Sequence, residues 1–321
     1  LWGDPDYVRR LAASTHLYDG PGAASASFDV NEPLATWMAG QDHDAPPFDP
    51  LQPAYRAHRW PFERYWHFYQ LWGRLSYNPQ TPPEVWEVEF ERRFGAEAGP
   101  LVARALHRAS RILPRIVAYN YPYNLFPTTR GWIEKQRMGD LPEYAAALPS
   151  DTQQFQSFAG AARDQIQGQS SAKIHPLDSS AWFARLSAEV LSLVEAAEAR
   201  AKGARTPEFA ATVVDLRILA YLALYHARRC QAGYSYALWE QSQDLHMLDD
   251  ALSHEESAIE AWAQIVAAAG NAYADDLPLG LARAGLTGHW RDERTALRQG
   301  LAALQAERST FRPAQPDTKP H

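Results

Sequence analysis

The densest group of residues that could do chemistry lies in the first third of the chain. Asp29, Asn31 and Glu32 stand in the sequence Phe-Asp-Val-Asn-Glu-Pro, where a short candidate strand, residues 26–30, would end. In a parallel barrel the carboxyl ends of the strands bind ligands, so we expect these three side chains to contact a substrate. The alternative is a polar loop in which Asp29 and Asn31 only cap neighbouring backbone groups.

A second polar group, Asp42, His43 and Asp44, follows in a proline-rich loop. Two carboxylates beside an imidazole could bind a sugar hydroxyl, bind a metal, or tune the pKa of the histidine. A metal site would lack a third convincing ligand, and solvated loop polarity is the main alternative. We therefore predict no metal here and keep the three residues as candidate substrate contacts.

Aromatic residues crowd positions 55–77 in greater number than one helix stripe can bury. Aromatic faces pack against the apolar faces of sugar rings, while nearby polar groups bind the hydroxyls. Trp66 and Trp72 are therefore candidate sugar contacts, although a helix buried on all sides would also account for the segment. A later aromatic loop adds Tyr121 and Tyr123, which lie among asparagines suited to hydroxyl recognition.

Composition narrows the class of protein. The chain has 321 residues, of which 46% are hydrophobic, enough to bury a large core. A net charge of −7 and the lack of a basic run disfavour nucleic-acid binding, and the apolar stretches are shorter than the roughly 20 residues of a membrane helix. Cys230 is the only cysteine, so an intrachain disulfide is excluded. Nucleotide-binding and hydrolase fingerprints are absent, and we expect no cofactor.

Apolar periodicity and capping signals predict a mainly α fold. Residues 4–12 look like a capped helix. Together with the candidate strand they resemble one helix–strand unit of an α/β barrel. The further predicted helices are 81–95, 101–119, 178–201, 206–229, a tract over 234–274 with a break near 253, and 291–307.

Local signals support three of these helices. Thr81 and Thr206, each followed by proline, are predicted N-caps, and Trp86, Phe90 and Phe94 form an apolar stripe on the helix after Thr81. The break near 253 is expected because Ser253 and Glu256 have the spacing of a capping box.

The predicted organisation is a helical bundle-like domain preceded by a short α/β remnant of a (β/α)8 barrel. We expect residues 1–50 to form the end of the barrel and a connecting loop, residues 51–309 an all-helical domain, and residues 310–321 a loose tail.

Three stretches together resemble the end of a (β/α)8 barrel that runs into an all-helical C-terminal domain. They are residues 2–10, 28–33 and 65–79, and the last contains Leu-Trp-Gly-Arg-Leu-Ser-Tyr-Asn-Pro. The chain is similar in this to bacterial glycoside hydrolases of the α-glucuronidase-like and hexosaminidase-like kind. The resemblance implies a barrel that supplies two carboxylates flanking the glycosidic bond. Because the chain has room for only about one barrel repeat, we expect those carboxylates upstream of Leu1 and no hydrolysis by the isolated chain.

The expected function is therefore the C-terminal region of a carbohydrate-active enzyme that contributes sugar-binding and structural residues. Its partners would be a carbohydrate substrate and the upstream barrel, with neither nucleic acid nor membrane. A periplasmic or secreted location would follow from that interpretation. The alternative is a non-catalytic helical interaction or structural domain whose aromatic segment docks onto a partner protein.

Two spacings on predicted helices allow other chemistry. His246, Asp250 and His254 stand at i, i+4 and i+8, which could place metal ligands on one helix face, but a polar face is our interpretation. His226 and Cys230 are also four apart, and without a visible carboxylate partner we interpret them as core residues.

Overall fold

Helices dominate the structure, a computed structural model that describes residues 3–12, 49–119, 141–201, 205–278 and 287–311. The mainly α class is confirmed. One antiparallel strand pair occurs in these ranges, β1 (Leu277–Pro278) with β2 (Thr287–Gly288), two residues each. The candidate strand at 26–30 lies outside the described residues.

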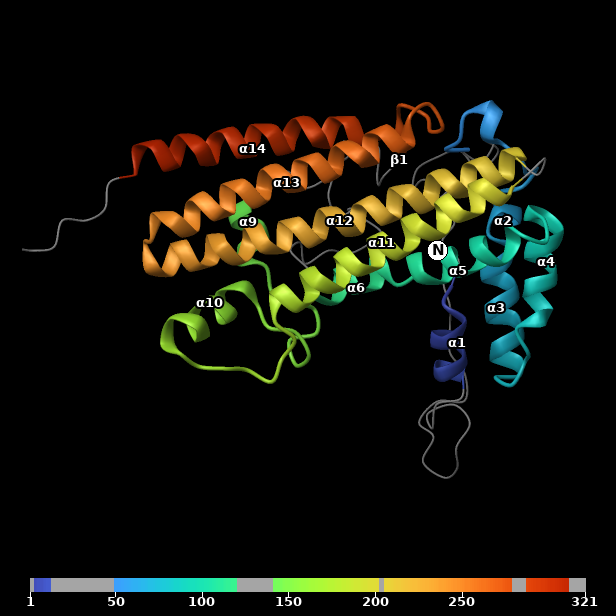
Figure 1. The fold of residues 1–321 in the computed structure, drawn as a ribbon, viewed down its shortest axis with the longest axis horizontal. Coiled ribbons are helices and arrows are strands. Elements are labelled where there is room, and N and C mark those ends of the chain that lie inside the picture. Colours follow the sequence, from blue (N-terminus) through green and yellow to red (C-terminus); the bar gives the residue numbers. More distant parts are fainter. Residues whose placement is uncertain (1–2, 13–48, 120–140, 202–204, 279–286, 312–321) are drawn as a thin grey trace, which may run out of the picture. The chain divides into compact units, whose positions relative to one another are not determined.

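The chain divides into two compact units, each assembled from three segments. Unit 1 is Leu1–Arg115, Arg185–Ala223 and Gln264–His289, and unit 2 is Ile116–Ala184, Leu224–Ala263 and Trp290–His321. Long helices contribute residues to both units: α11 (Pro176–Arg200), α12 (Pro207–Ser242) and α13 (Leu245–Ala269) (Figure 1).

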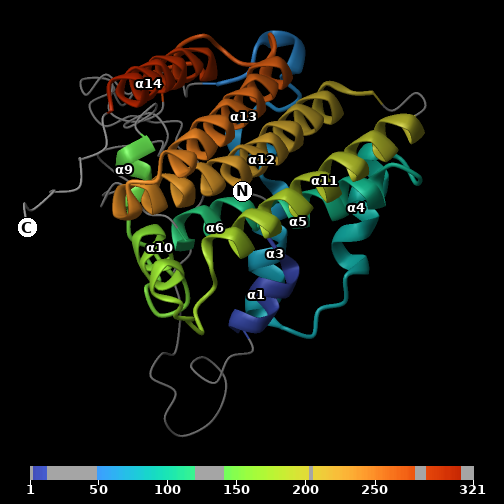
Figure 2. The ribbon, with the colours of Figure 1, turned by 60° about the vertical axis from the view of Figure 1, so that its left-hand side comes forward.

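Short helices make up the N-terminal part of unit 1. In chain order they are α1 (Pro5–Ala12), the 3₁₀ turn η1 (Pro53–Tyr55), α2 (Pro61–Arg64), α3 (Trp66–Tyr77), α4 (Glu84–Phe94), α5 (Gly99–Ala109) and the first residues of α6 (Ile112–Tyr119). Helix α1 packs on α3, and α4 packs on both α3 and α5 (Figures 1 and 2).

Helix α4 shows how the aromatic pattern sets local structure. Trp86, Phe90 and Phe94 recur every four residues and are all buried, as predicted. Gly95 ends the helix with φ at 86°, a left-handed conformation that glycine adopts without steric cost. The predicted N-cap is wrong, because the Thr81 hydroxyl donates to the carbonyl of Asn78 at 2.7 Å instead.

Unit 2 contains α9 (Leu141–Ala146), α10 (Phe158–Gln167) and α14 (Trp290–Thr310), with the remaining parts of the long helices. The α14 helix confirms the predicted one at 291–307. Its start is tied to α13, because the buried Trp262 indole N–H donates to the Trp290 carbonyl at 2.8 Å. Near the other end, the Arg308 guanidinium lies 2.6 Å from an Asp249 carboxylate oxygen.

Helix α12 begins as predicted but extends further. The Thr206 hydroxyl accepts from the Phe209 N–H at 3.1 Å, which caps the first turn. A predicted end near Arg229 is wrong, since the helix continues through Gly233 to Ser242. A Cβ at Gly233 would lie only 3.2 Å from the Tyr144 ring, so glycine here permits close packing and does not interrupt the helix.

The helix break expected near residue 253 lies ten residues earlier. Gln243 has φ at 58° and separates α12 from α13. The Asp244 side chain then accepts from the His246 N–H at 3.0 Å and caps the new helix. Ser253 is an interior residue of α13, where its capping signature is not used.

Within the part of the chain that the structure describes, α12 alone is long and apolar enough to cross a membrane by length and composition. Its most apolar window has a mean hydropathy of 1.3, and 67% of that window is buried inside the protein. A mostly buried core helix passes the same test.

The approach of α5 to α4 generates a stability prediction. A Cβ at Gly99 would lie 2.6 Å from the Phe90 carbonyl oxygen, a backbone atom that cannot move alone. We expect Gly99→Ala to lower the free energy of unfolding by about 1–3 kcal/mol, the usual cost of overpacking. The matched control is Gly73→Ala in α3, where a Cβ would meet nothing within 4 Å. That change should raise stability by about 0.5–1 kcal/mol through helix propensity. Urea unfolding measures both, and equal effects of the two variants would contradict the packing argument.

Candidate functional site

The aromatic segment at 55–77 divides between core and surface. The residues of α3 that are fully buried are His67, Leu71 and Leu75, on one face of the helix. Trp60 is 47% exposed and Tyr69 37% exposed. Helix α3 is therefore not buried on all sides, which excludes that alternative for the aromatic segment.

An open pocket of about 690 Å³ lies in unit 1 where the chain before α2 meets α3 and α4. Trp66 and Tyr69 provide its aromatic wall. The remaining lining side chains that carry polar groups are His58, Arg59, Glu63 and Arg93. Rings and charged groups thus share one concave surface.

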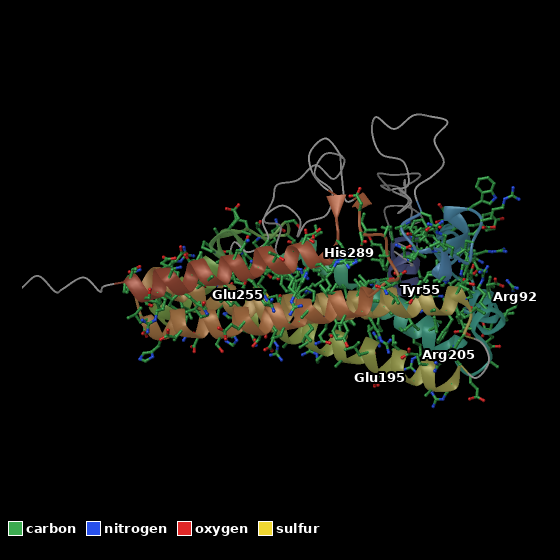
Figure 3. The ribbon with its side chains drawn as sticks, turned by 90° about the horizontal axis from the view of Figure 1, so that it is seen from above. Tyr55, Arg92, Glu195, Arg205, Glu255 and His289 are labelled. Atoms are coloured by element: carbon green, nitrogen blue, oxygen red, sulfur yellow. The ribbon has the colours of Figure 1, made fainter. Side chains whose placement is uncertain are left out.

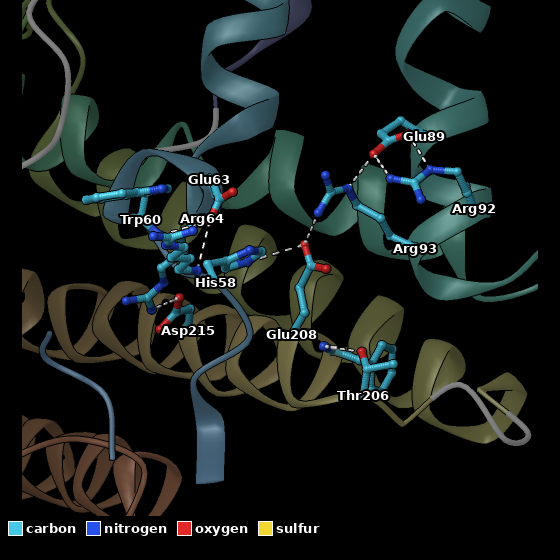
Figure 4. Close-up of polar contacts among 12 residues, drawn as sticks. His58, Trp60, Glu63, Arg64, Glu89, Arg92, Arg93, Thr206, Glu208 and Asp215 are labelled. Carbon is cyan, nitrogen blue, oxygen red and sulfur yellow. Dashed lines mark hydrogen bonds and ion pairs between the residues drawn. The ribbon is translucent and has the colours of Figure 1, made fainter. Parts of the chain in front are cut away.

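Arg93 is the central polar residue of this pocket. Its guanidinium lies 2.6 Å from a Glu89 carboxylate oxygen and 2.9 Å from a Glu208 carboxylate oxygen, which ties α4 to α12 (Figure 4). The same guanidinium lies 4.7 Å from the centre of the Trp66 ring. Two carboxylates and one ring therefore fix its position, and Arg92 adds a second cation on Glu89.

His58 occupies the other side of Glu208. Its Nε2 lies 3.6 Å from the same Glu208 oxygen that Arg93 contacts. Burial lowers the pKa of His58, against the opposing attraction of Glu208. The imidazole is therefore a neutral hydrogen-bonding group near pH 7.

Glu63 stabilises the chain segment that leads into the pocket. Its carboxylate accepts the backbone N–H groups of Arg59 and Trp60, each at 2.8 Å (Figure 4). These hydrogen bonds hold the pKa of Glu63 below its usual value, so the side chain is ionised.

A second polar group, beside the pocket, fixes α2. Arg64 donates to Asp215 at 2.5 Å and to the Tyr273 hydroxyl at 3.0 Å, and that hydroxyl in turn donates to Asp215. Burial opposes the charge on Arg64, but Asp215 together with the neighbouring Tyr273 and Tyr65 exceeds that effect and raises the pKa of the guanidinium well above its ordinary value. The ion pair therefore persists across the physiological pH range.

A narrow cavity of about 20 Å³ shares His58 and Trp66 with the open pocket. His67 also lines it, and no described group hydrogen-bonds to the buried His67 Nδ1. A cavity of this volume holds about one water molecule.

His67 forms a buried pair with His107. Their Nε2 atoms are 2.9 Å apart and their rings are stacked with centres 5.1 Å apart. Burial lowers the pKa of His107 to about 4 and that of His67 well below its ordinary value. Both rings are therefore neutral near pH 7, and one donates its proton to the other.

The structure places the predicted site residues unequally. Trp66 lines the pocket, whereas Trp72 lies outside it, against Phe68 and Tyr7. The other eight candidates lie outside the described residues: Asp29, Asn31, Glu32, Asp42, His43, Asp44, Tyr121 and Tyr123.

Sequence reasoning missed His58, Glu63 and Arg93, which the fold brings to the pocket. Only Glu63 had a local signal, because a carboxylate three or four residues after free backbone N–H groups is a capping pattern. The partnership of Arg93 with Glu208 joins residues 115 positions apart and has no signature in the sequence.

Unit 2 contains a buried aromatic and polar cluster around His226, which has two phenol neighbours. Its Nδ1 lies 3.3 Å from the Tyr119 hydroxyl and 3.2 Å from the Tyr144 hydroxyl. Cys230 is fully buried in the same region, so the interpretation of this spacing as core is confirmed.

The cluster continues into a buried ion pair, in which Arg229 lies 3.5 Å from Glu255 of α13. Figure 3 labels Glu255 on its helix. Burial raises the pKa of Glu255, and Arg229 opposes that shift.

The metal alternative on α13 has no structural support. Among the residues that the structure places, no group of three or more His, Cys, Asp or Glu side chains could hold a metal ion. His246, Asp250 and His254 are spread along α13 without converging on one point.

The His67–His107 pair predicts a pH dependence of stability. Unfolded histidine takes up a proton near pH 6.5, whereas folded His107 resists protonation until about pH 4. The unfolded chain therefore binds more protons in this range, and the free energy of unfolding falls as the pH drops, by up to about 1.4 kcal/mol per pH unit for one group. We expect His107→Leu to reduce this slope between pH 4 and 6.5, measured by urea unfolding.

The control for that experiment is Glu89→Gln. Hydrogen bonds from Arg92 and Arg93 lower the pKa of Glu89 from 4.5 to about 2, so its contribution is present above pH 4.5 and is lost as the pH falls below it. Its replacement should lower the free energy of unfolding by a constant amount above pH 4.5 and change the slope of the profile only below that pH. An unchanged slope in His107→Leu would show that the pair does not titrate as the structure indicates.

Comparison with known proteins gives a likeness of fold. No family model and no curated protein matches the sequence. A solved structure described as a GH138 enzyme targeting pectin rhamnogalacturonan II is similar, with a TM-score of 0.60 and 14% sequence identity. The likeness covers 77% of this chain and 38% of the enzyme's chain, so this chain spans well under half the length of its structural neighbour. The helical fold is therefore like that of a part of a glycoside hydrolase.

Proposed function

We propose that this chain is the C-terminal region of a glycoside hydrolase and that its unit 1 pocket is a sugar-binding subsite. The observation that carries the proposal is the aromatic and charged pocket around Trp66, on a fold similar to part of a glycoside hydrolase. Within this proposal residues 1–50 end an upstream barrel, residues 51–309 form the helical domain and residues 310–321 form a tail.

The chemistry of the pocket supports sugar binding. Tyr69 presents 37% of its surface and can stack on the apolar face of a sugar ring. Arg93 and neutral His58 offer N–H groups to hydroxyl oxygens, and their positions are set by Glu208 before a ligand arrives. Such preorganisation lowers the entropic cost of binding.

The carboxylates of the pocket argue against catalysis within it. A glycosidase needs one carboxylic acid with a raised pKa to protonate the leaving group. The pKa of Glu63, which lines the pocket, is shifted in the opposite direction, and Glu208, which contacts the pocket residue Arg93 but does not line the pocket, already accepts that guanidinium. We therefore place the catalytic pair in the upstream barrel and expect the isolated chain to bind sugar without hydrolysing it.

The remaining candidate contacts belong to the same proposal. They would supply hydroxyl recognition from the end of the barrel and from the second aromatic loop: Asp29, Asn31, Glu32, Asp42, His43, Asp44, Tyr121 and Tyr123.

A binding screen tests the proposed function. The isolated chain is titrated by calorimetry and thermal shift with uronic acids, N-acetylhexosamines and fragments of rhamnogalacturonan II, because a ligand of the native state raises the melting temperature. We expect Tyr69→Ala to weaken the binding of any sugar found by about tenfold, roughly 1.4 kcal/mol.

The control is Tyr77→Ala, on the same helix, 91% exposed and outside the pocket lining. It should bind like the wild type. A cooperative melt with no response to any sugar would contradict the proposal and favour a helical interaction domain.

A further inference from the structure

A row of aromatic rings leaves the pocket along α3 and reaches α1. Its members, called here the aromatic strip, are Tyr69, Phe68, Trp72 and Tyr7. The ring centres are 5.4 Å apart from Tyr69 to Phe68, 6.2 Å from Phe68 to Trp72, and 6.4 Å from Trp72 to Tyr7. The rings therefore form one continuous series of contacts, and α1 and α3 lie side by side in both ribbon views (Figures 1 and 2).

The aromatic strip is a surface feature. The core-facing side of α3 is made by His67, Leu71 and Leu75, which are all buried. In contrast, Tyr7 is 51% exposed and Tyr69 is 37% exposed, while Phe68 and Trp72 are half-buried. Both ends of the strip thus reach solvent.

The pocket and its surroundings indicate what the aromatic strip binds. Tyr69 lines the pocket and is also the first ring of the strip, so one ligand can occupy both. At the far end Tyr7 stands beside the exposed Asp6 and the half-buried Arg9, whose charged atoms are 3.9 Å apart. The core of a protein interface is depleted of such charges, whereas a sugar needs both rings and polar groups.

We propose that the aromatic strip extends the sugar site, so that the ligand of unit 1 is an oligosaccharide chain and not a single sugar. This inference rests on the proposed function, because it assumes that the pocket binds the first sugar. Successive rings of the ligand lie over successive aromatic residues from Tyr69 toward Tyr7. Affinity then rises with ligand length.

A length series tests this inference. Galacturonate oligomers and neutral xylose oligomers, each from the single sugar upward, are titrated by calorimetry into the wild type, Tyr7→Ala, Trp72→Ala and the control Tyr77→Ala. Whichever of the two series binds the wild type, we expect its affinity to rise with the length of the oligomer. For the longer oligomers, each strip variant should bind about threefold to tenfold more weakly than the wild type. For the single sugar, its affinity should equal that of the wild type. If Trp72→Ala fails to fold, the comparison of Tyr7→Ala with the wild type is sufficient for the test.

The outcomes separate the two proposals. Single-sugar binding without a gain for longer oligomers would overturn the aromatic strip alone, and so would a gain that Tyr7→Ala leaves intact. Failure of every sugar to bind would overturn the proposed function and the strip with it. Self-association of the wild type that is lost in Tyr7→Ala, seen by analytical ultracentrifugation without a length effect, would show instead that a second copy covers the strip.

Discussion

The contact of Arg93 with Glu208 is the interaction on which the site depends. It joins α4 to α12, and the same Glu208 oxygen lies 3.6 Å from His58 Nε2, so one carboxylate contacts both polar walls of the pocket. The pair is mostly shielded from water, with about a fifth of each side chain exposed or less. Removing Arg93 would leave Glu208 partly buried without a cationic partner, which costs more than the pair contributes. The Arg93 guanidinium also lies 4.7 Å from the centre of the Trp66 ring, so the fixed arginine helps to hold that ring in place.

The surrounding packing keeps this geometry in place. Gly99 allows α5 to approach α4, and the buried aromatic stripe of α4 anchors the helix that carries Arg93. The Arg64 and Asp215 pair fixes the short α2 helix against α12, so the chain bearing His58 enters the pocket at a set angle. The sugar-binding proposal therefore rests on a scaffold of helices and not on a single loop, which suits a preformed subsite.

Much of the fold was predictable from the sequence because local signals sufficed. The stripe at Trp86, Phe90 and Phe94 and the cap at Thr206 both act within one or two turns, and both are confirmed. Helix continuity through Gly233 was not predictable, because glycine there serves a contact with Tyr144 from a distant segment. The site was half predictable: aromatic density indicated Trp66, but the pairing of Arg93 with Glu208 is set by tertiary structure.

The most direct test of the central claim is an NMR titration that follows the indole N–H signal of Trp66, assigned by its loss in Trp66→Phe. A sugar found to bind by calorimetry is added to the isolated chain, and the buried Trp262 indole, in unit 2, serves as the internal reference. We expect a saturable shift of the Trp66 signal, with the Trp262 signal unchanged. A saturable shift confined to other tryptophans, or none at all across sugars that bind by calorimetry, would contradict the assignment of the pocket as the sugar site.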